Sequence, residues 1–224
     1  MRQIPAVKTP TLTTLLDESA ALHRHLCPRQ VLGVRMGLCG PVWLGLEAPR
    51  DDKHLLTIIE TDGCAADGVS VATGCTVGRR TLHVMDYGKV AATFVDVRTG
   101  QAIRVVPHPG VREAARRLVP DARSRWHAQL EAYQIMPEAA LLVVQPVTLT
   151  LSLERLISRP GYRVTCEACG EEIINEREVV QQGRVLCQAC AGHGYYHVRE
   201  DVQHDGSRRH PPMNMSTHSH IFAA

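Results

Sequence analysis

Two Cys-x-x-Cys pairs near the C-terminus are the clearest chemical signal in the sequence. Cys166 and Cys169 form the first pair, and Cys187 and Cys190 form the second. Zn²⁺ in structural sites prefers a closed tetrahedron of thiolates, and each pair can supply two sulfurs from one tight turn. A turn predicted at residues 182–183 would bring the two pairs together. The spacing therefore predicts a four-cysteine zinc ribbon, and two disulfide-forming or redox-active pairs are the alternative.

The predicted zinc of this ribbon would be structural. Four thiolates leave no open coordination position for a substrate or a water molecule. The segment around the pairs also has few apolar residues, so it could hardly fold without the metal. We expect no catalysis at these four cysteines.

A second group of cysteines and histidines lies in the N-terminal half of the chain. His23, His25 and Cys27 fall within five residues, and Cys64 and Cys75 lie in a later segment rich in small residues. Imidazole and thiolate side chains could converge on a second Zn²⁺ or on another borderline-soft transition metal, with an open coordination position. The alternative is ordinary packing, because free cysteine is among the most buried residue types. Spacing alone leaves both interpretations open.

Helices and strands must position these residues. The apolar spacing predicts a helix within residues 11–26, and Pro28 suits the first turn of a second helix, so the two would meet between His23 and Cys27. Pro146 favours an edge or a bulge for the last strand of the core. Strands are predicted at residues 54–60, on either side of a turn at residues 98–100, and within residues 141–151. A helix followed by a Gly-rich turn is predicted within residues 64–82, and short helices are predicted at residues 111–119 and 124–136.

These patterns predict an α+β core domain with a small C-terminal four-cysteine zinc ribbon. We place the core at residues 1–158, the ribbon at residues 159–198 and a flexible His-rich tail at residues 199–224. Loose metal binding by the tail histidines is an alternative to a tail without a fixed role.

Composition narrows the class of protein. Hydrophobic residues make up 44% of the 224 residues but aromatic residues only 4%, so the core must be built mainly from Val, Leu, Ile and Ala. A net charge of +2 argues against a nucleic-acid partner for the whole chain. The sequence has no apolar run of the roughly 20 residues that a spanning helix needs, and its N-terminus lacks the apolar core of a secretory signal. We therefore expect a cytoplasmic protein that does not enter a membrane, in which paired cysteines bind metal rather than form disulfides.

An ordered series of short motifs runs through the core. The motifs are His23-x-His25-x-Cys27-Pro28, Gly33-x-Arg35, Glu60-Thr61-Asp62-Gly63-Cys64 with Asp67, Thr73-Gly74-Cys75-Thr76 with Gly78, and Asp86-Tyr87-Gly88-Lys89. Together with the ribbon, this series resembles the FmdE family, which is named after the FmdE component of molybdenum formylmethanofuran dehydrogenase. The resemblance implies an α+β core, a separate zinc module, a homodimer and a metal-binding cleft lined by the His/Cys motif. It also suggests a molybdenum or tungsten enzyme as a partner.

Two positions depart from the family pattern. Arg24 and Arg29 stand where the family usually has glycine, and only glycine enters left-handed backbone angles without cost. Either the turn is rearranged, or the two guanidinium groups serve a ligand of this protein, such as a carboxylate or an oxyanion. Salt bridges to Asp17 or Glu18 are the simpler alternative.

The sequence leaves three functions open. The favoured one is a metal-binding accessory protein with a structural zinc ribbon and a second metal site in the core cleft. The second is an enzyme that uses the cleft for metal-assisted or thiol chemistry, although no general base identifies itself. The third is a regulator that binds partners through the ribbon, which the acidic character of that module disfavours.

Overall fold

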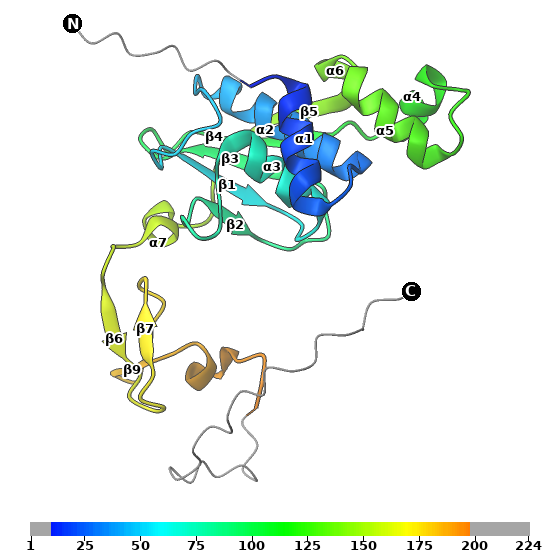
Figure 1. Ribbon diagram of the computed structural model, residues 1–224. Helices are drawn as coiled ribbons and strands as arrows, with labels where there is room; N and C mark the ends of the chain where they lie inside the picture. Colours follow the sequence, from blue (N-terminus) through cyan, green and yellow to red (C-terminus); the bar gives the residue numbers. More distant parts are fainter. Residues whose placement is uncertain (1–9, 198–224) are drawn as a thin grey trace, which may run out of the picture. The chain divides into compact units, whose positions relative to one another are not determined.

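The structure is a computed structural model that describes residues 10–197, and its fold class matches the sequence prediction. The chain divides into two compact units after Ser158. The first unit is a mixed α+β core, and the second carries the four ribbon cysteines (Figure 1). The tail histidines lie outside the described residues.

A five-stranded sheet in the order β2-β1-β3-β4-β5 is the centre of the first unit. β1 pairs with β2 in parallel, and every other neighbouring pair is antiparallel. Pro146 lies in the edge strand β5, as predicted, where its missing N–H is tolerated. The strands are β1 (Leu55–Ile59), β2 (Leu82–Val84), β3 (Ala92–Asp96), β4 (Ala102–Pro107) and β5 (Leu142–Val147).

Helices α1, α2 and α3 pack on one face of this sheet (Figure 1). Their ends follow local signals: the Thr11 hydroxyl accepts a hydrogen bond from Thr14 N–H at the start of α1, and Gly74 ends α3 in the left-handed conformation. The helices of the unit are α1 (Leu12–His23), α2 (Pro28–Trp43), α3 (Cys64–Thr73), α4 (Val111–Leu118), α5 (Arg125–Ile135), α6 (Glu138–Leu141) and α7 (Leu153–Ile157).

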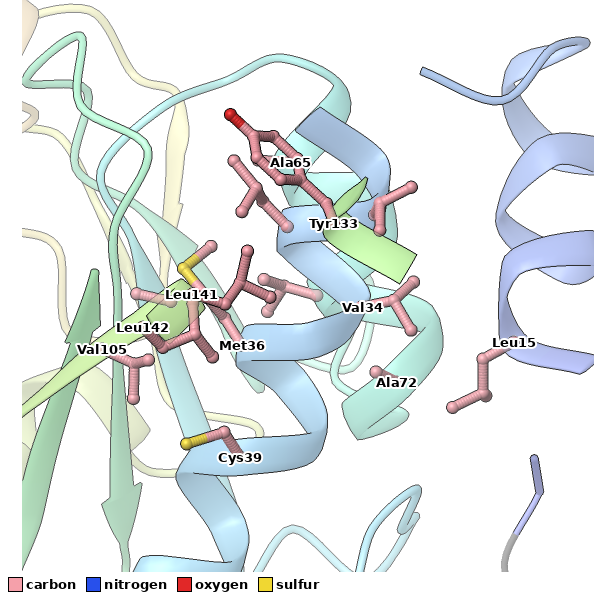
Figure 2. Close-up of a cluster of buried hydrophobic side chains, with 14 of the residues drawn as sticks. Leu15, Val34, Met36, Cys39, Ala65, Ala72, Val105, Tyr133, Leu141 and Leu142 are labelled. Atoms are coloured by element: carbon pink, nitrogen blue, oxygen red, sulfur yellow. The ribbon is translucent and has the colours of Figure 1, made fainter. Parts of the chain in front are cut away.

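The core between helices and sheet is mainly aliphatic, as the composition predicts. Figure 2 shows Val34 and Met36 of α2 among side chains from α1, α3, β4 and β5. Phe94 and Tyr133 are the two fully buried aromatic side chains of the described chain. On the other face of the sheet, a smaller cluster includes Leu156 of α7.

Two glycines allow α2 and α3 to cross at close range. A Cβ on Gly33 would lie 2.3 Å from the carbonyl oxygen of Ala65, and a Cβ on Gly68 would lie 2.4 Å from the carbonyl oxygen of Gln30. Both contacts lie in the first half of their helices. The crossing therefore brings the N-terminal ends of α2 and α3 together.

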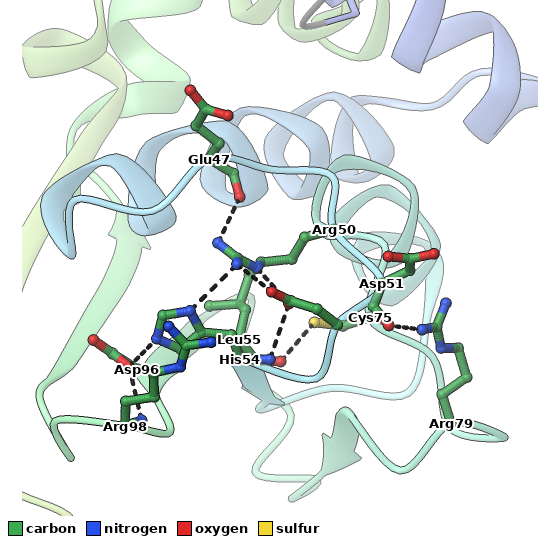
Figure 3. A network of polar contacts seen from close by, with 10 residues as sticks. Glu47, Arg50, Asp51, His54, Leu55, Cys75, Arg79, Asp96 and Arg98 are labelled. Carbon is green, nitrogen blue, oxygen red and sulfur yellow. Dashed lines mark hydrogen bonds and ion pairs between the residues drawn. The ribbon is translucent and has the colours of Figure 1, made fainter. Parts of the chain in front are cut away.

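A polar network fastens the segment before β1 to the sheet (Figure 3). His54 Nε2 lies 2.7 Å from Asp96 Oδ1 at the end of β3, and both side chains are largely buried. His54 Nδ1 contacts the Arg50 guanidinium, which also binds Asp52 through two nitrogens. Asp96 accepts a hydrogen bond from Arg98 N–H in the predicted β3–β4 turn.

The second unit is built from two small hairpins. β6 (Arg163–Thr165) pairs with β7 (Glu172–Ile174), and β8 (Val179–Gln181) pairs with β9 (Arg184–Leu186), followed by a helical turn, η1 (Ala189–His193). The predicted turn at residues 182–183 joins β8 to β9, with both residues at positive φ. The buried apolar cluster of this second unit consists of Cys166, Ile173 and Leu186. Such a core is too small to stabilise the unit alone.

The sequence prediction missed the short strand β2. Its three residues carry little periodicity, and their pairing with β1 depends on the chain folding back after α3. No helix within residues 10–197 is long and apolar enough to cross a membrane.

Candidate functional site

The four ribbon cysteines come together although one pair lies between β6 and β7 and the other pair follows β9. Their sulfur atoms all lie within 4.8 Å of one another, and Cys169 Sγ is 3.9 Å from Cys187 Sγ. A tetrahedral zinc with Zn–S bonds of about 2.3 Å requires sulfurs about 3.8 Å apart. The four donors therefore fit a four-thiolate zinc site.

Backbone N–H groups donate hydrogen bonds to two of these sulfurs. Cys187 N–H donates to Cys166 Sγ at 3.2 Å, and Cys190 N–H donates to Cys187 Sγ at 3.4 Å. Backbone donors from Cys169 and Cys187 lower the pKa of Cys166 to about 6, whereas hydrogen bonding to the sulfurs of Cys187 and Cys169 raises the pKa of Cys190 to about 12. Four sulfurs this close cannot all ionise without a cation between them. The group is therefore suited to bind a metal.

A chain of three side chains joins α1 to α3 in the core unit. His23, at the end of α1, places Nε2 3.2 Å from Cys64 Sγ, and Cys64 is the first residue of α3. Asp67 Oδ2 lies 3.1 Å from His23 Nδ1 and fixes the orientation of the ring. A carboxylate in this position is the usual outer-shell partner of a metal-binding histidine, and it also orients the histidine of a thiol nucleophile.

Cys27 completes this group from α2. It is the N-cap of the helix, and it is buried. Burial raises the pKa of the Cys64 thiol, the neighbouring Cys27 side chain raises it further, and both cysteines line one cavity. The fully buried Gln30 fixes this geometry: its Oε1 accepts from Cys27 N–H, and its Nε2 donates to the Ser19 carbonyl of α1.

Arg24 and Arg29 adopt different backbone conformations, which shows whether the turn around them is rearranged. Arg24 adopts φ 64°, so the left-handed turn that glycine favours is kept, with an arginine in it. Arg29 lies within the first turn of α2 and has ordinary helical geometry. Within residues 10–197 neither arginine forms an ion pair, so the alternative of salt bridges to Asp17 or Glu18 is wrong.

Cys75 lies away from this group, and its inclusion in the predicted second site is corrected. It follows the C-terminal end of α3, whereas Cys64 begins it, and a helix of ten residues is about 15 Å long. The Cys75 thiol is buried against β1, where it contacts the Leu55 carbonyl (Figure 3). Its sulfur also accepts a hydrogen bond from the Thr57 hydroxyl. It therefore packs in the core.

The predicted second metal site is also less closed than the ribbon site. Among residues 10–197, only the four ribbon cysteines bring three or more potential metal-ligand atoms close together. The ring of the exposed His25 lies beside that of His23, tilted by 51°, with centroids 4.9 Å apart. In the core, His23 contacts Cys64 through one ring nitrogen and Asp67 through the other, and Cys27 lines the same cavity as Cys64.

A cavity of about 350 Å³ opens beside Cys27 and Cys64. Its volume is within the range of small-molecule sites. The wall combines two cysteines, two arginines and a mainly apolar surface that includes two aromatic side chains. The lining residues are Cys27, Pro28, Arg29, Leu32, Cys64, Val90, Pro107, Val111, Arg112, Trp126, Gln129 and Tyr133.

The family comparison agrees with this arrangement. The family model described as FmdE, molybdenum formylmethanofuran dehydrogenase operon, matches residues 22–143, which is more than half of the chain. The chain belongs to the FmdE family. The predicted resemblance is confirmed, and the description of the family names a molybdenum formylmethanofuran dehydrogenase operon.

Two relatives place this FmdE protein among known ones. A probable S-adenosyl-L-methionine-binding protein of Archaeoglobus fulgidus is 33% identical over 226 aligned positions, which cover 88% of this chain and 58% of that protein. The chain thus spans little more than half of that relative. A crystal structure of an FmdE-like protein of the tungsten formylmethanofuran dehydrogenase type, from Syntrophus aciditrophicus, has a TM-score of 0.55 at 21% identity, covering 87% of this chain and all of that one. This second likeness concerns the fold.

Sequence analysis missed three residues of the site. Gln30 has no chemical signature, and only its contacts with α1 show that it sets the loop between the histidines and Cys27. Arg112 and Trp126 belong to helices α4 and α5, far from the motifs in sequence. Arg112 lies in an arginine-rich part of the sequence, residues 104–125, but whether its side chain lines the cavity depends on the fold.

Proposed function

We propose that this FmdE-family protein is a metal-binding accessory protein with two different metal sites. Cys166, Cys169, Cys187 and Cys190 would hold a structural zinc. His23, Cys27 and Cys64 would hold a second Zn²⁺ or another transition metal with a position open to the cavity. The observation that carries the second site is the line from Asp67 through His23 to the Cys64 sulfur, next to the Cys27 thiol.

The chemistry of the donors supports an open core site. Two sulfurs and one imidazole nitrogen are the three protein ligands found in some catalytic zinc sites, where the fourth position holds water or substrate. Asp67 would hold the His23 ring through Nδ1 and leave Nε2 free for the metal. Such a metal would act as a Lewis acid toward a ligand in the cavity.

Metal analysis of full-length variants tests the proposal. The wild-type chain should hold about two metal ions, and Cys64→Ala should lose about one of them with the fold intact. Cys75→Ala is the matched control, because it removes a buried core thiol outside the site and should keep both ions. Equal metal content in Cys64→Ala and the wild-type chain would refute the core site.

A thiol-dependent enzyme is the second candidate, supported by the same contacts. His23 lies within hydrogen-bonding distance of Cys64 Sγ, and Asp67 orients it, as in enzymes that activate a cysteine nucleophile. Iodoacetamide distinguishes the two candidates. A free nucleophile should label at Cys64 in the chain as purified, whereas a metal ligand should label only after chelation.

The proposal includes a setting for the protein. We propose a cytoplasmic homodimer that acts with a molybdenum or tungsten enzyme, in line with the family's operon. S-adenosyl-L-methionine binding is named for the longer Archaeoglobus relative, and it is not part of the function proposed for this chain. Light scattering should give twice the chain mass of 24.7 kDa, and a monomeric mass would refute the dimer.

A further inference from the structure

The cavity beside Cys27 and Cys64 has a charge pattern that the metal proposal does not use. Arg29 and Arg112 both line it, from α2 and from α4. Both side chains are exposed, and neither forms an ion pair with any residue between 10 and 197. Two unpaired guanidinium groups at one cavity make a site for a carboxylate or phosphate group.

The helices around the cavity add to this positive potential. α2, α3 and α4 all begin at its wall, where Pro28, Cys64 and Val111 are their first residues. The N-terminal end of a helix carries a partial positive charge and free N–H groups, which favour anions. The nearby carboxylate Asp67 contacts His23 and forms no ion pair with Arg29 or Arg112. Glu113, beside Arg112, lines a different cavity.

The rest of the wall suits a flat apolar body. Trp126 is 43% exposed although it lines the cavity, so part of its ring is open to a ligand. Tyr133 also lines the cavity and is buried; burial raises the pKa of its hydroxyl, while nearby Arg112 lowers that pKa and nearby Glu113 raises it. Aromatic side chains stack on flat rings and bind them over a large area.

We infer that this cavity binds a small ligand that joins a carboxylate or phosphate group to a flat, apolar body. Arg29 and Arg112 hold the anionic group, and Trp126 contacts the ring. The inference rests on the proposed function in taking this cavity as the functional site, but the arginines and Trp126 would act without the metal.

The fluorescence of Trp126 reports binding directly. The chain has two tryptophans, so Trp43→Phe leaves Trp126 as the single emitter in the full-length protein. Benzoate and phenyl phosphate serve as probes with the two kinds of anionic group, and benzamide is the neutral match of benzoate. We expect a saturable change of Trp126 emission with at least one anionic probe, in the millimolar range of a small fragment, and much weaker binding of benzamide.

The double variant Arg29→Gln/Arg112→Gln tests the two cations in the Trp43→Phe background. It should weaken binding of the anionic probe by about tenfold or more, since each lost charged hydrogen bond costs at least that much. Arg116→Gln/Arg117→Gln removes two arginines of the neighbouring cavity and should leave binding unchanged. Benzoate and phenyl phosphate titrated in parallel show which anionic group the cavity prefers.

Three results would overturn the inference: no saturable change with either anion, equal binding of benzamide, or equal binding by the double variant. Metal content, measured on the same samples, separates this outcome from failure of the proposed function. Loss of metal in Cys64→Ala with benzoate binding retained supports both ideas. A wild-type chain without core metal that binds benzoate through the arginines refutes the metal site alone.

Discussion

The ribbon and the core cleft use cysteine in opposite ways. In the ribbon, four cysteines converge on one point within a unit whose buried apolar cluster includes little beyond Ile173 and Leu186. In the core, a large aliphatic cluster positions two helix ends, and the proposed metal site there has His23, Cys27 and Cys64 as its ligands. The metal should therefore stabilise the fold of the ribbon, whereas the fold of the core should form its site without the metal.

The burial of the sulfurs reflects the same difference. Cys169 and Cys190 are exposed, and only zinc would hold them in place. Cys39 and Cys75 in the core are buried by neighbouring side chains, and burial raises the pKa of the Cys39 thiol to about 12, so it stays protonated at neutral pH. A cysteine in this protein is thus a ligand or a packing residue according to its surroundings.

Removing one ribbon cysteine should have the largest effect. Cys187→Ser should release about one zinc per chain and unfold the ribbon, because structural zinc contributes of the order of 10 kcal/mol to such modules. The unfolding midpoint of the core, followed by calorimetry, should not change. The control variant Cys39→Ala, which removes a protonated core thiol, should keep the full zinc content of the ribbon. Full zinc content in Cys187→Ser would break the comparison.

Adding a side-chain atom between α2 and α3 should lower the stability of the core and leave the ribbon unchanged. Gly33→Ala places a Cβ 2.3 Å from the Ala65 carbonyl oxygen, so the helices must separate. We expect a loss of about 1–3 kcal/mol in the free energy of unfolding and a lower metal content in the core. Gly78→Ala is the control, since nothing lies within 4 Å of its added Cβ. Equal stability of the two variants in urea would show that the crossing is not tight.

The His54–Asp96 pair should give a smaller effect that depends on pH. Burial alone would raise the pKa of Asp96, but hydrogen bonds from Arg98 and Thr99 and the nearby His54 lower it overall. The ionised carboxylate therefore stabilises the fold above the unfolded pKa of about 3.9, and this contribution is lost as the pH falls through the folded pKa.

Asp96→Asn should accordingly cost about 1–3 kcal/mol at pH 7 and progressively less below about pH 4. Urea unfolding of the core at several pH values measures this difference, and the zinc content of the ribbon at pH 7 should stay constant. Asp121→Asn, at an exposed position, is the control. A penalty that stays constant down to pH 3 would contradict the role of the ionised carboxylate.

The sequence alone predicts most of the local structure of the core. Pro28 marks the start of α2, Gly100 the turn between β3 and β4, and Pro146 the edge strand, because each of these residues restricts the backbone in a definite way. The short strand β2 has no comparable marker. Its position depends on pairing with β1, which is a property of the whole fold.

The candidate site is less predictable than the fold. The close spacing of His23 and Cys27 identifies one part of it, and the family motif adds Cys64. Cys75 shows the limit of that reasoning, because a cysteine in a shared motif can lie at the other end of the same helix. Arg112 joins the cavity only because α4 begins there, which no local pattern indicates.

Hydrogen exchange with and without a strong zinc chelator tests the central contrast most directly. Mass spectrometry of the full-length chain would follow peptides from both units in one experiment. We predict that chelation removes protection from the backbone amides of β6 to β9 and leaves the amides of β1, β3 and β4 protected. Unchanged protection of the ribbon hairpins after complete zinc removal, or loss of protection in the central sheet, would contradict the account.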